Sequence, residues 1–210
     1  APLNPAPACM EDASSALRWI TAHADRFGVD PSRILVAGDS AGATIAVTAT
    51  VAGSVRQRST WARRLLEEGP SLRGCIAACG VFGVDDPAWR RSDRARAPRV
   101  REIFQTMKRR FDDPWNYSDR LELPSTDVVS ILESAVPEIR ALPELFAFVG
   151  THDPVEEDTR RLASAYRARG ARVTSCIYPG QRHVFHAISL GSAARDVWRK
   201  QLAFAARCLT

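Results

Sequence analysis

The residues with the clearest chemical meaning form a short run, Gly38-Asp39-Ser40-Ala41-Gly42, which reads G-x-S-x-G. It stands between an apolar stretch that predicts a strand and a small-residue stretch that predicts a helix. A serine at such a sharp turn projects its hydroxyl above the sheet, and small neighbours let adjacent segments pass close to the turn. The amide of Ala41 and the start of the helix favour negative charge at the same place. We interpret Ser40 as a nucleophile, with Gly38, Ala41 and Gly42 as its elbow and oxyanion donor. The alternative is a tight turn without chemistry.

A serine hydroxyl is a weak nucleophile at neutral pH and needs a general base that a carboxylate holds in place. The chain offers four histidines, at positions 23, 152, 183 and 186. Asp153 and His183 each follow a stretch that predicts a strand, so both are expected at the carboxyl ends of parallel strands, where such sheets build their sites. We predict His183 as the base and Asp153 as its acid partner. His186, three residues further on, is the competing candidate for the base.

Helical and strand patterns alternate along much of the chain, which favours an α/β domain with a mostly parallel sheet flanked by helices. Residues 13–24 place apolar side chains at helical spacing, and Gly28 supplies a stop after them. The expected strands are 33–37, 75–81, 145–149 and 172–178, and the further expected helices are 41–52, 61–68, 157–169 and 192–208.

The alternation breaks down between residues 83 and 140. Five prolines and a cluster of arginines in this segment predict a helical lid inserted into the domain rather than core. Residues 1–82 are then the half of the core that carries the nucleophile, and residues 141–210 the half that carries the acid and the base. All three parts belong to one domain, because 210 residues suit a single hydrophobic core.

The net charge of +5 is concentrated in one segment. Residues 90–110 hold nine basic and two acidic residues, so this segment carries +7 and the rest of the chain −2. Its scattered prolines and few aromatic residues argue against a nucleic-acid-binding module. We interpret the segment as a solvated face of the lid. The alternative is that it steers an anionic acyl substrate or an acidic partner to the protein.

The composition, with 45% hydrophobic and 25% charged residues, is that of an ordinary globular protein and excludes collagen-like and low-complexity chains. The longest weakly polar run, residues 41–53, is too short to span a bilayer, and no signal peptide opens the chain. Five scattered cysteines without metal-ligand spacing predict thiols of a reducing compartment and no metal site, which favours a cytoplasmic location. Because the sequence begins at Ala1 and not at methionine, we expect a processed or truncated product.

Residues 30–42, Asp-Pro-Ser-Arg-Ile-Leu-Val-Ala-Gly-Asp-Ser-Ala-Gly, resemble the nucleophile region of the hormone-sensitive-lipase-like esterases. Asp153-Pro154, with the carboxylates that follow it, is similar to the acid motif of that family. The stretch from Tyr178 to His183, with Phe185, resembles its base motif, Tyr-x-Gly-x-x-His-Gly-Phe. The lead-in over residues 1–13 is also similar, so the likeness runs in the right order over nearly the whole chain outside the insertion.

The resemblance implies an α/β-hydrolase fold with Ser40 as nucleophile, Asp153 as acid and His183 as general base. The implied reaction is hydrolysis of a small-molecule carboxylic ester with a short acyl chain, through an acyl-enzyme and without cofactor or metal. An amidase or peptidase on the same fold is an alternative, since the triad alone does not separate esters from amides. The candidates for substrate contact are Asp39, Val184 and Phe185.

The chain departs from the family pattern in three places. Ala43 and Val184 stand where the family has glycine, which would narrow or reshape the pocket. The family's His-Gly-Gly oxyanion motif does not occur in these residues, and we expect it, with the first strands of the sheet, upstream of Ala1. The nucleophile strand is then expected at an exposed sheet edge, which a second copy or a partner could cover. If the missing donors are not replaced, the chain is a catalytically silent relative that acts as a binding or scaffold protein.

Overall fold

A computed structural model of the chain describes residues 6–83, 127–188 and 190–210. Four strands form one sheet in the order β1-β2-β3-β4, and each neighbouring pair runs parallel. Parallel neighbours need a crossover connection, and helices lie between successive strands along the chain. The expected α/β class with a parallel sheet is confirmed. The strands are β1 (Leu35–Asp39), β2 (Gly74–Ala78), β3 (Glu144–Gly150) and β4 (Val173–Tyr178).

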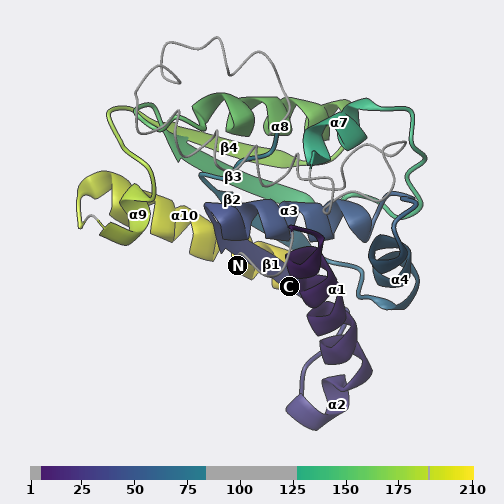
Figure 1. The fold of residues 1–210 in the computed structure, drawn as a ribbon. Coiled ribbons are helices and arrows are strands. Elements are labelled where there is room, and N and C mark those ends of the chain that lie inside the picture. Colours follow the sequence, from purple (N-terminus) through teal and green to yellow (C-terminus); the bar gives the residue numbers. More distant parts are fainter. Residues whose placement is uncertain (1–5, 84–126, 189) are drawn as a thin grey trace.

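Helices cover both faces of this sheet (Figure 1). On one face lie α3 (Ala41–Ala52), α7 (Val128–Glu133) and α8 (Glu156–Ala168), and on the other lies α10 (Ser192–Leu209). The remaining helices are α1 (Ala6–Ala22), α2 (Ala24–Phe27), α4 (Thr60–Glu68) and α9 (Phe185–Ile188). Within the described ranges, none of these helices combines the length and the apolar character that crossing a bilayer requires.

The nucleophile strand β1 begins two residues later than the pattern predicted. Asp30 holds a turn at this place, because its carboxylate accepts a hydrogen bond from the amide of Ser32 at 2.8 Å and its carbonyl accepts one from the amide of Arg33 at 3.0 Å. Extended structure therefore starts only after the turn and runs to Asp39. Ser40 follows directly, and α3 starts at Ala41 as predicted. The chain thus passes from strand to helix within a single residue.

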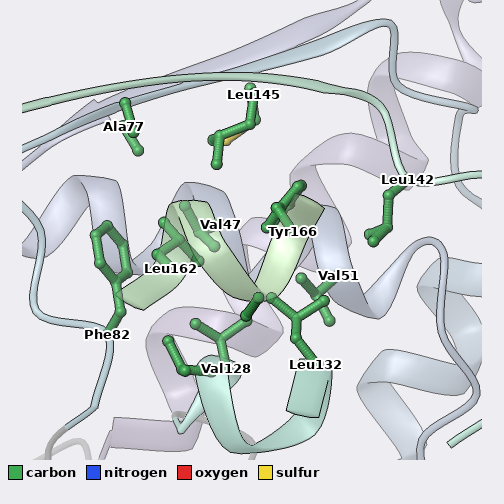
Figure 2. Packing of buried hydrophobic residues seen from close by; sticks show 14 of the residues in the cluster. Val47, Val51, Ala77, Phe82, Val128, Leu132, Leu142, Leu145, Leu162 and Tyr166 are labelled. Carbon is green, nitrogen blue, oxygen red and sulfur yellow. The ribbon is translucent and has the colours of Figure 1, made fainter. Parts of the chain in front are cut away.

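The face covered by α3, α7 and α8 has a continuous aliphatic core (Figure 2). Successive strand residues point to opposite faces, so only alternate positions of β2 and β3 enter this cluster. Leu162 and Tyr166, one turn apart on α8, lie between the sheet and α7 and are fully buried. The residues packed with them are Val47 and Val51 of α3, Val128 and Leu132 of α7, and Ala77 and Leu145 of the sheet.

The opposite face is packed mainly by aromatic rings. Phe146 of β3 lies with its ring centroid 5.9 Å from Phe148 of the same strand and 5.6 Å from Phe204 of α10. All three rings are buried. β2 and β3 are consequently covered on both faces, as expected of central parallel strands.

β1 is less buried than these two strands. It lies at one edge of the sheet, and its residues Ala37 and Asp39 are exposed. This agrees with the expectation that the nucleophile strand forms a sheet edge. That a second copy or a partner covers this edge stays a prediction.

The structure describes only the last part of the segment 83–140 that we predicted as an inserted lid. The arginine cluster at 90–110 lies outside the described residues. Residues 128–133 form α7, whose Val128 and Ile131 are buried in the aliphatic core. This part differs from the expectation because its apolar run forms a helix that packs between α3 and α8 (Figure 2). The division into 1–82, 83–140 and 141–210 stays a prediction.

Candidate active site

The turn at Ser40 is a strained backbone position. Ser40 has φ 52° and ψ −119°, a conformation that few residues other than glycine adopt. Its amide donates a hydrogen bond to the carbonyl of Ala78 on β2 at 2.8 Å, which ties the turn to the neighbouring strand. The amide of Ala41 is the first of α3, and a first helical amide has no partner within its own helix. Ser40 therefore stands at the carboxyl end of β1, beside an amide that is able to bind an oxyanion.

Two glycines flank this turn, and only one of them is required by close packing. A Cβ atom at Gly38 would overlap the carbonyl oxygen of Gly42, so residue 38 must be glycine for the turn to close. A Cβ atom at Gly42 would meet no atom of the described residues within 4 Å. Close packing among the described residues therefore explains the glycine at position 38, and a role for Gly42 in the elbow stays a prediction.

Asp153 lies in the turn that follows β3, and its side chain is fully buried. One carboxylate oxygen accepts a hydrogen bond from the amide of Val155 at 3.1 Å. The other oxygen is 2.8 Å from Nδ1 of His183. A carboxylate away from water needs such donors, since burying a charge without partners is costly. The turn therefore holds an acceptor whose two oxygens both have partners.

His183 lies in the loop after β4 and contacts both other residues of the predicted triad. Its Nδ1 faces Asp153, and its Nε2 is 2.9 Å from Oγ of Ser40. A carboxylate only accepts hydrogen bonds, so Nδ1 carries the proton, and Nε2 of the neutral ring is free to accept the proton of the serine hydroxyl. The hydrogen bond to Asp153 raises the pKa of His183, although partial burial opposes the shift. Ser40, Asp153 and His183 come from three separate loops and meet in one hydrogen-bonded chain.

The loop of His183 rests on the loop of Asp153. The amide of His152 donates a hydrogen bond to the carbonyl of Gln181 at 2.9 Å. A Cβ atom at Gly150 would overlap that same carbonyl, so glycine at the end of β3 lets the two loops approach. This close approach fixes where the imidazole stands relative to the acid.

His186, the competing candidate for the base, lies in the aromatic core. Its side chain is buried, and its ring packs edge-on against Phe148 at a centroid distance of 4.9 Å. Burial lowers its pKa, and within the described chain its Nδ1 has no hydrogen-bond partner. Ser40 is hydrogen-bonded to His183 instead. The other two histidines, at positions 23 and 152, are exposed.

The three candidates for substrate contact have different environments. Asp39 is exposed at the end of β1, and its negative charge helps to raise the pKa of His183. Val184 is half-buried next to His183. Phe185 is buried, and its ring centroid is 5.1 Å from that of Tyr178. The Phe185 ring fills the core behind the base loop, whereas Asp39 and Val184 are at least partly exposed, and contact of any of the three with a substrate stays a prediction.

A residue that the sequence analysis did not single out, Cys79, lies behind the triad. Its Sγ, a carboxylate oxygen of Asp153 and a ring nitrogen of His183 lie within 4.8 Å of one another. Burial raises the pKa of Cys79 to about 12, so the thiol keeps its proton at neutral pH. No signal in the sequence indicated this position, since the predicted strand 75–81 includes Cys79, and only the structure ends β2 at Ala78.

A family model described as alpha/beta hydrolase fold matches residues 1–187 of the chain. The chain belongs to the α/β-hydrolase family. Among curated relatives of this α/β-hydrolase, the carboxylesterase NlhH of Mycobacterium tuberculosis strain CDC 1551 / Oshkosh is 31% identical over 185 residues, which is 87% of this chain and 53% of that protein. The carboxylic ester hydrolase LipN of Mycobacterium tuberculosis strain H37Rv is 42% identical over 181 residues, which is 82% of this chain and 43% of that protein. The chain thus spans about half the length of these relatives.

Solved structures have the same fold. An esterase from Pyrobaculum calidifontis aligns with all of this α/β-hydrolase chain and 64% of its own, with a TM-score of 0.77 and 20% identity. An esterase from the bacterial hormone-sensitive lipase family aligns with 100% of this chain and 63% of its own, with a TM-score of 0.75 and 20% identity. The α/β-hydrolase fold that the motifs indicated is confirmed.

Proposed function

We propose that this α/β-hydrolase is a serine carboxylic-ester hydrolase that works through an acyl-enzyme intermediate. The observation that carries the proposal is the position of the His183 ring, with one nitrogen 2.9 Å from the Ser40 hydroxyl and the other 2.8 Å from the buried Asp153. The curated relatives named carboxylesterase and carboxylic ester hydrolase support an ester as the substrate.

In the acylation step, Oγ of Ser40 attacks the ester carbonyl carbon while Nε2 of His183 takes the hydroxyl proton. Negative charge then develops on the carbonyl oxygen, and the amide of Ala41 at the start of α3 donates to it. Asp153 holds the ring in the tautomer with Nδ1–H and stabilises the imidazolium. As the tetrahedral intermediate collapses, His183 returns the proton to the leaving alcohol, and the acyl group remains on Ser40.

In the deacylation step, a water molecule takes the place of the alcohol beside Nε2 of His183. The ring accepts a proton from this water, whose oxygen attacks the acyl carbon. As the second tetrahedral intermediate collapses, the bond to Oγ of Ser40 breaks, Nε2 of His183 returns the proton to Oγ, and the carboxylic acid is released. Every proton movement uses the same nitrogen, so no cofactor is needed for either half-reaction. We propose a small, short-chain acyl ester as substrate and a cytoplasmic location.

The experiment that tests this function measures p-nitrophenyl butyrate hydrolysis by the purified protein and by its Ser40→Ala variant. We expect turnover by the wild type and a loss of about 10⁴-fold or more in kcat for the variant, because the other groups do not replace the nucleophile. Labelling with a fluorophosphonate, followed by mass spectrometry of the modified peptide, should place the adduct on Ser40.

Two histidine variants give the matched control. His183→Ala should lose activity to a similar extent, whereas His186→Phe should keep kcat within about threefold, since it replaces a buried ring that already packs on aromatic neighbours. Equal, background-level rates in wild type and Ser40→Ala, with no adduct on Ser40, would contradict the proposal and leave a binding or scaffold role. Hydrolysis of the matching p-nitroanilide at a comparable rate would favour an amidase.

A further inference from the structure

Backbone strain in this molecule is concentrated around the triad. In the described parts of the chain, three residues other than glycine have a positive φ: Ser40 at 52°, Cys79 at 50° and Val184 at 56°. Ser40 belongs to the triad, Val184 follows His183, and Cys79 has its sulfur close to both Asp153 and His183. Such a conformation costs free energy, most of all for a β-branched residue like Val184, and persists only where surrounding contacts enforce it. The contacts of Cys79 therefore bear on how the site keeps its shape.

The main chain of Cys79 continues the ladder between two strands. Its amide donates a hydrogen bond to the carbonyl of Phe148 on β3 at 2.9 Å. The preceding residue, Ala78, accepts the hydrogen bond from the amide of Ser40. The side chain of Cys79 is fully buried. Its sulfur therefore belongs to a buried residue that is hydrogen-bonded to β3 and lies one residue beyond Ala78, which accepts the hydrogen bond from Ser40.

The sulfur of Cys79 bridges the acid loop and the base loop. Its Sγ lies within 4.8 Å of a carboxylate oxygen of Asp153 and of a ring nitrogen of His183. Hydrogen bonding of the thiol to the Asp153 carboxylate raises the pKa of Cys79, and hydrogen bonding from the amide of Val184 to the sulfur lowers it, although burial has the largest effect. The first bond adds a donor to a buried carboxylate that already accepts from Val155 and His183. The second bond holds the strained residue that directly follows the base. One buried atom thus links the two loops whose separation sets the distance between Asp153 and His183.

We propose that Cys79 is a positioning residue of the active site, whose buried thiol fastens the Asp153 turn to the strained Val184 backbone and so holds His183 between the acid and Ser40. The inference rests on the proposed ester hydrolase function for its kinetic consequence. The expected effect of Cys79 on the position and pKa of the His183 ring does not depend on that function and follows from the geometry.

The role requires a protonated thiol, and the surroundings keep it so. Burial raises the pKa of Cys79 to about 12, and the negative charges of Asp153 and Asp39 act in the same direction. Cys79 is therefore a neutral hydrogen-bond donor and not a second nucleophile. The titratable groups that influence the His183 ring are Asp153 and Asp39, with Cys79 and His186 as neutral neighbours at pH 7.

Three variants separate positioning from simple packing. Cys79→Ala removes both hydrogen bonds, Cys79→Ser keeps a donor and an acceptor at the same place, and Cys75→Ala removes an equally buried thiol from β2, the strand that ends just before Cys79. On p-nitrophenyl butyrate we expect Cys79→Ala to lower kcat about tenfold or more with little change in KM, because a hydrogen bond to a charged group is lost. Cys79→Ser should recover kcat to within about threefold of wild type, and Cys75→Ala should leave kcat unchanged.

A second measurement does not depend on turnover. Titration of the His183 ring protons by NMR should give a raised pKa in the wild type and in Cys75→Ala. In Cys79→Ala we expect that pKa to fall toward the ordinary histidine value of 6.5 as the contact with Asp153 loosens, and in Cys79→Ser to return. An unchanged His183 pKa in Cys79→Ala would overturn the proposal, as would kcat equal to that of Cys75→Ala in an active enzyme. If the wild type itself hydrolyses no ester through Ser40, the proposed function fails, and the NMR titration still decides the role of Cys79.

Discussion

The carboxyl edge of the sheet and the core beneath α8 differ in how their residues are held in place. In the core, aliphatic side chains such as Leu162, together with the Tyr166 ring, fill the space between sheet and helices (Figure 2). At the carboxyl edge, a buried carboxylate, Asp153, sits among hydrogen bonds, and three residues adopt a positive φ. Packing stabilises the core. At the edge, the strained backbone and the buried carboxylate lower the stability of the fold, but they hold the polar groups in one arrangement.

The difference indicates that stability and activity should be separable by mutation. A change at the edge removes a hydrogen bond or a turn and leaves the packed layers as they are. A change in the core removes buried apolar area and leaves the triad of each folded molecule intact. The edge also depends on the core, because its three loops start from β1, β3 and β4, and the packed helices fix how those strands lie.

The largest expected effect is that of Asp153→Asn at the edge. The amide nitrogen of asparagine donates where the carboxylate accepted, so the His183 ring adopts the wrong tautomer and cannot take the Ser40 proton. We expect kcat to fall by about 10³–10⁴-fold with the midpoint of denaturant unfolding changed little. Asp196→Asn, a change in a partly exposed carboxylate on α10, is the control and should keep full activity. A loss of kcat of less than tenfold for Asp153→Asn would contradict the idea that changes at the edge affect activity without affecting stability.

Leu162→Ala tests the core side of the comparison. The side chain is fully buried between sheet and α7, so truncation should lower the free energy of unfolding by about 2–5 kcal/mol. The kcat of the remaining folded protein should stay within about twofold. Urea unfolding by circular dichroism, with activity per folded molecule, measures both quantities. Leu202→Ala, whose side chain is 67% exposed, should cost less than about 0.5 kcal/mol. A large drop in kcat for Leu162→Ala would show that the two regions are coupled.

Gly38→Ala tests the tight approach at the elbow. Its new Cβ would overlap the carbonyl of Gly42, so the turn has to open and Ser40 has to move. A displacement of about 1 Å at a reacting group can cost on the order of 100-fold in rate, and we expect kcat to fall by that amount. Gly53→Ala at the far end of α3, where the nearest atom is 3.4 Å away, is the matched control. Equal rates for the two variants would mean that the elbow tolerates a wider turn.

The smallest effect concerns pH. General-base action requires a neutral His183, so activity should be lost as the pH falls through its pKa. The hydrogen bond to Asp153 raises that pKa, and the acidic limb of kcat/KM should therefore have its midpoint above the ordinary value of 6.5. A pH–rate profile on p-nitrophenyl butyrate measures this midpoint, and His186→Phe should not move it. A midpoint at or below 6.5 would mean that Asp153 raises the pKa of His183 less than the geometry indicates.

The sequence predicted those helices and strands whose own residue types and hydrophobic pattern favour that structure. Small residues between Ala41 and Gly53 have the pattern of a buried helix, and α3 has the predicted bounds. The strands with continuous apolar runs were placed to within a few residues. α7 was missed because a six-residue helix after several prolines has too few turns to show a period, and its burial comes from α3 and α8, which lie far from it in the chain.

For the site, the sequence by itself determined the residue types and their order. Gly38-x-Ser40-x-Gly42, Asp153 and His183 follow three predicted strands, and parallel strands bring their carboxyl ends to one edge. Only the tertiary structure decided which histidine lies beside Ser40, that Phe185 fills the core, and that the sulfur of Cys79 lies behind the acid. The resemblance to the base motif favoured His183 over His186, which lies three residues further on, but the hydrogen bond between the His183 ring and Ser40 is seen only in the tertiary structure. Val184, with its positive φ, lies between the two histidines: the His183 ring is hydrogen-bonded to Asp153, and the His186 ring packs into the aromatic core, because the surrounding elements provide these two different environments.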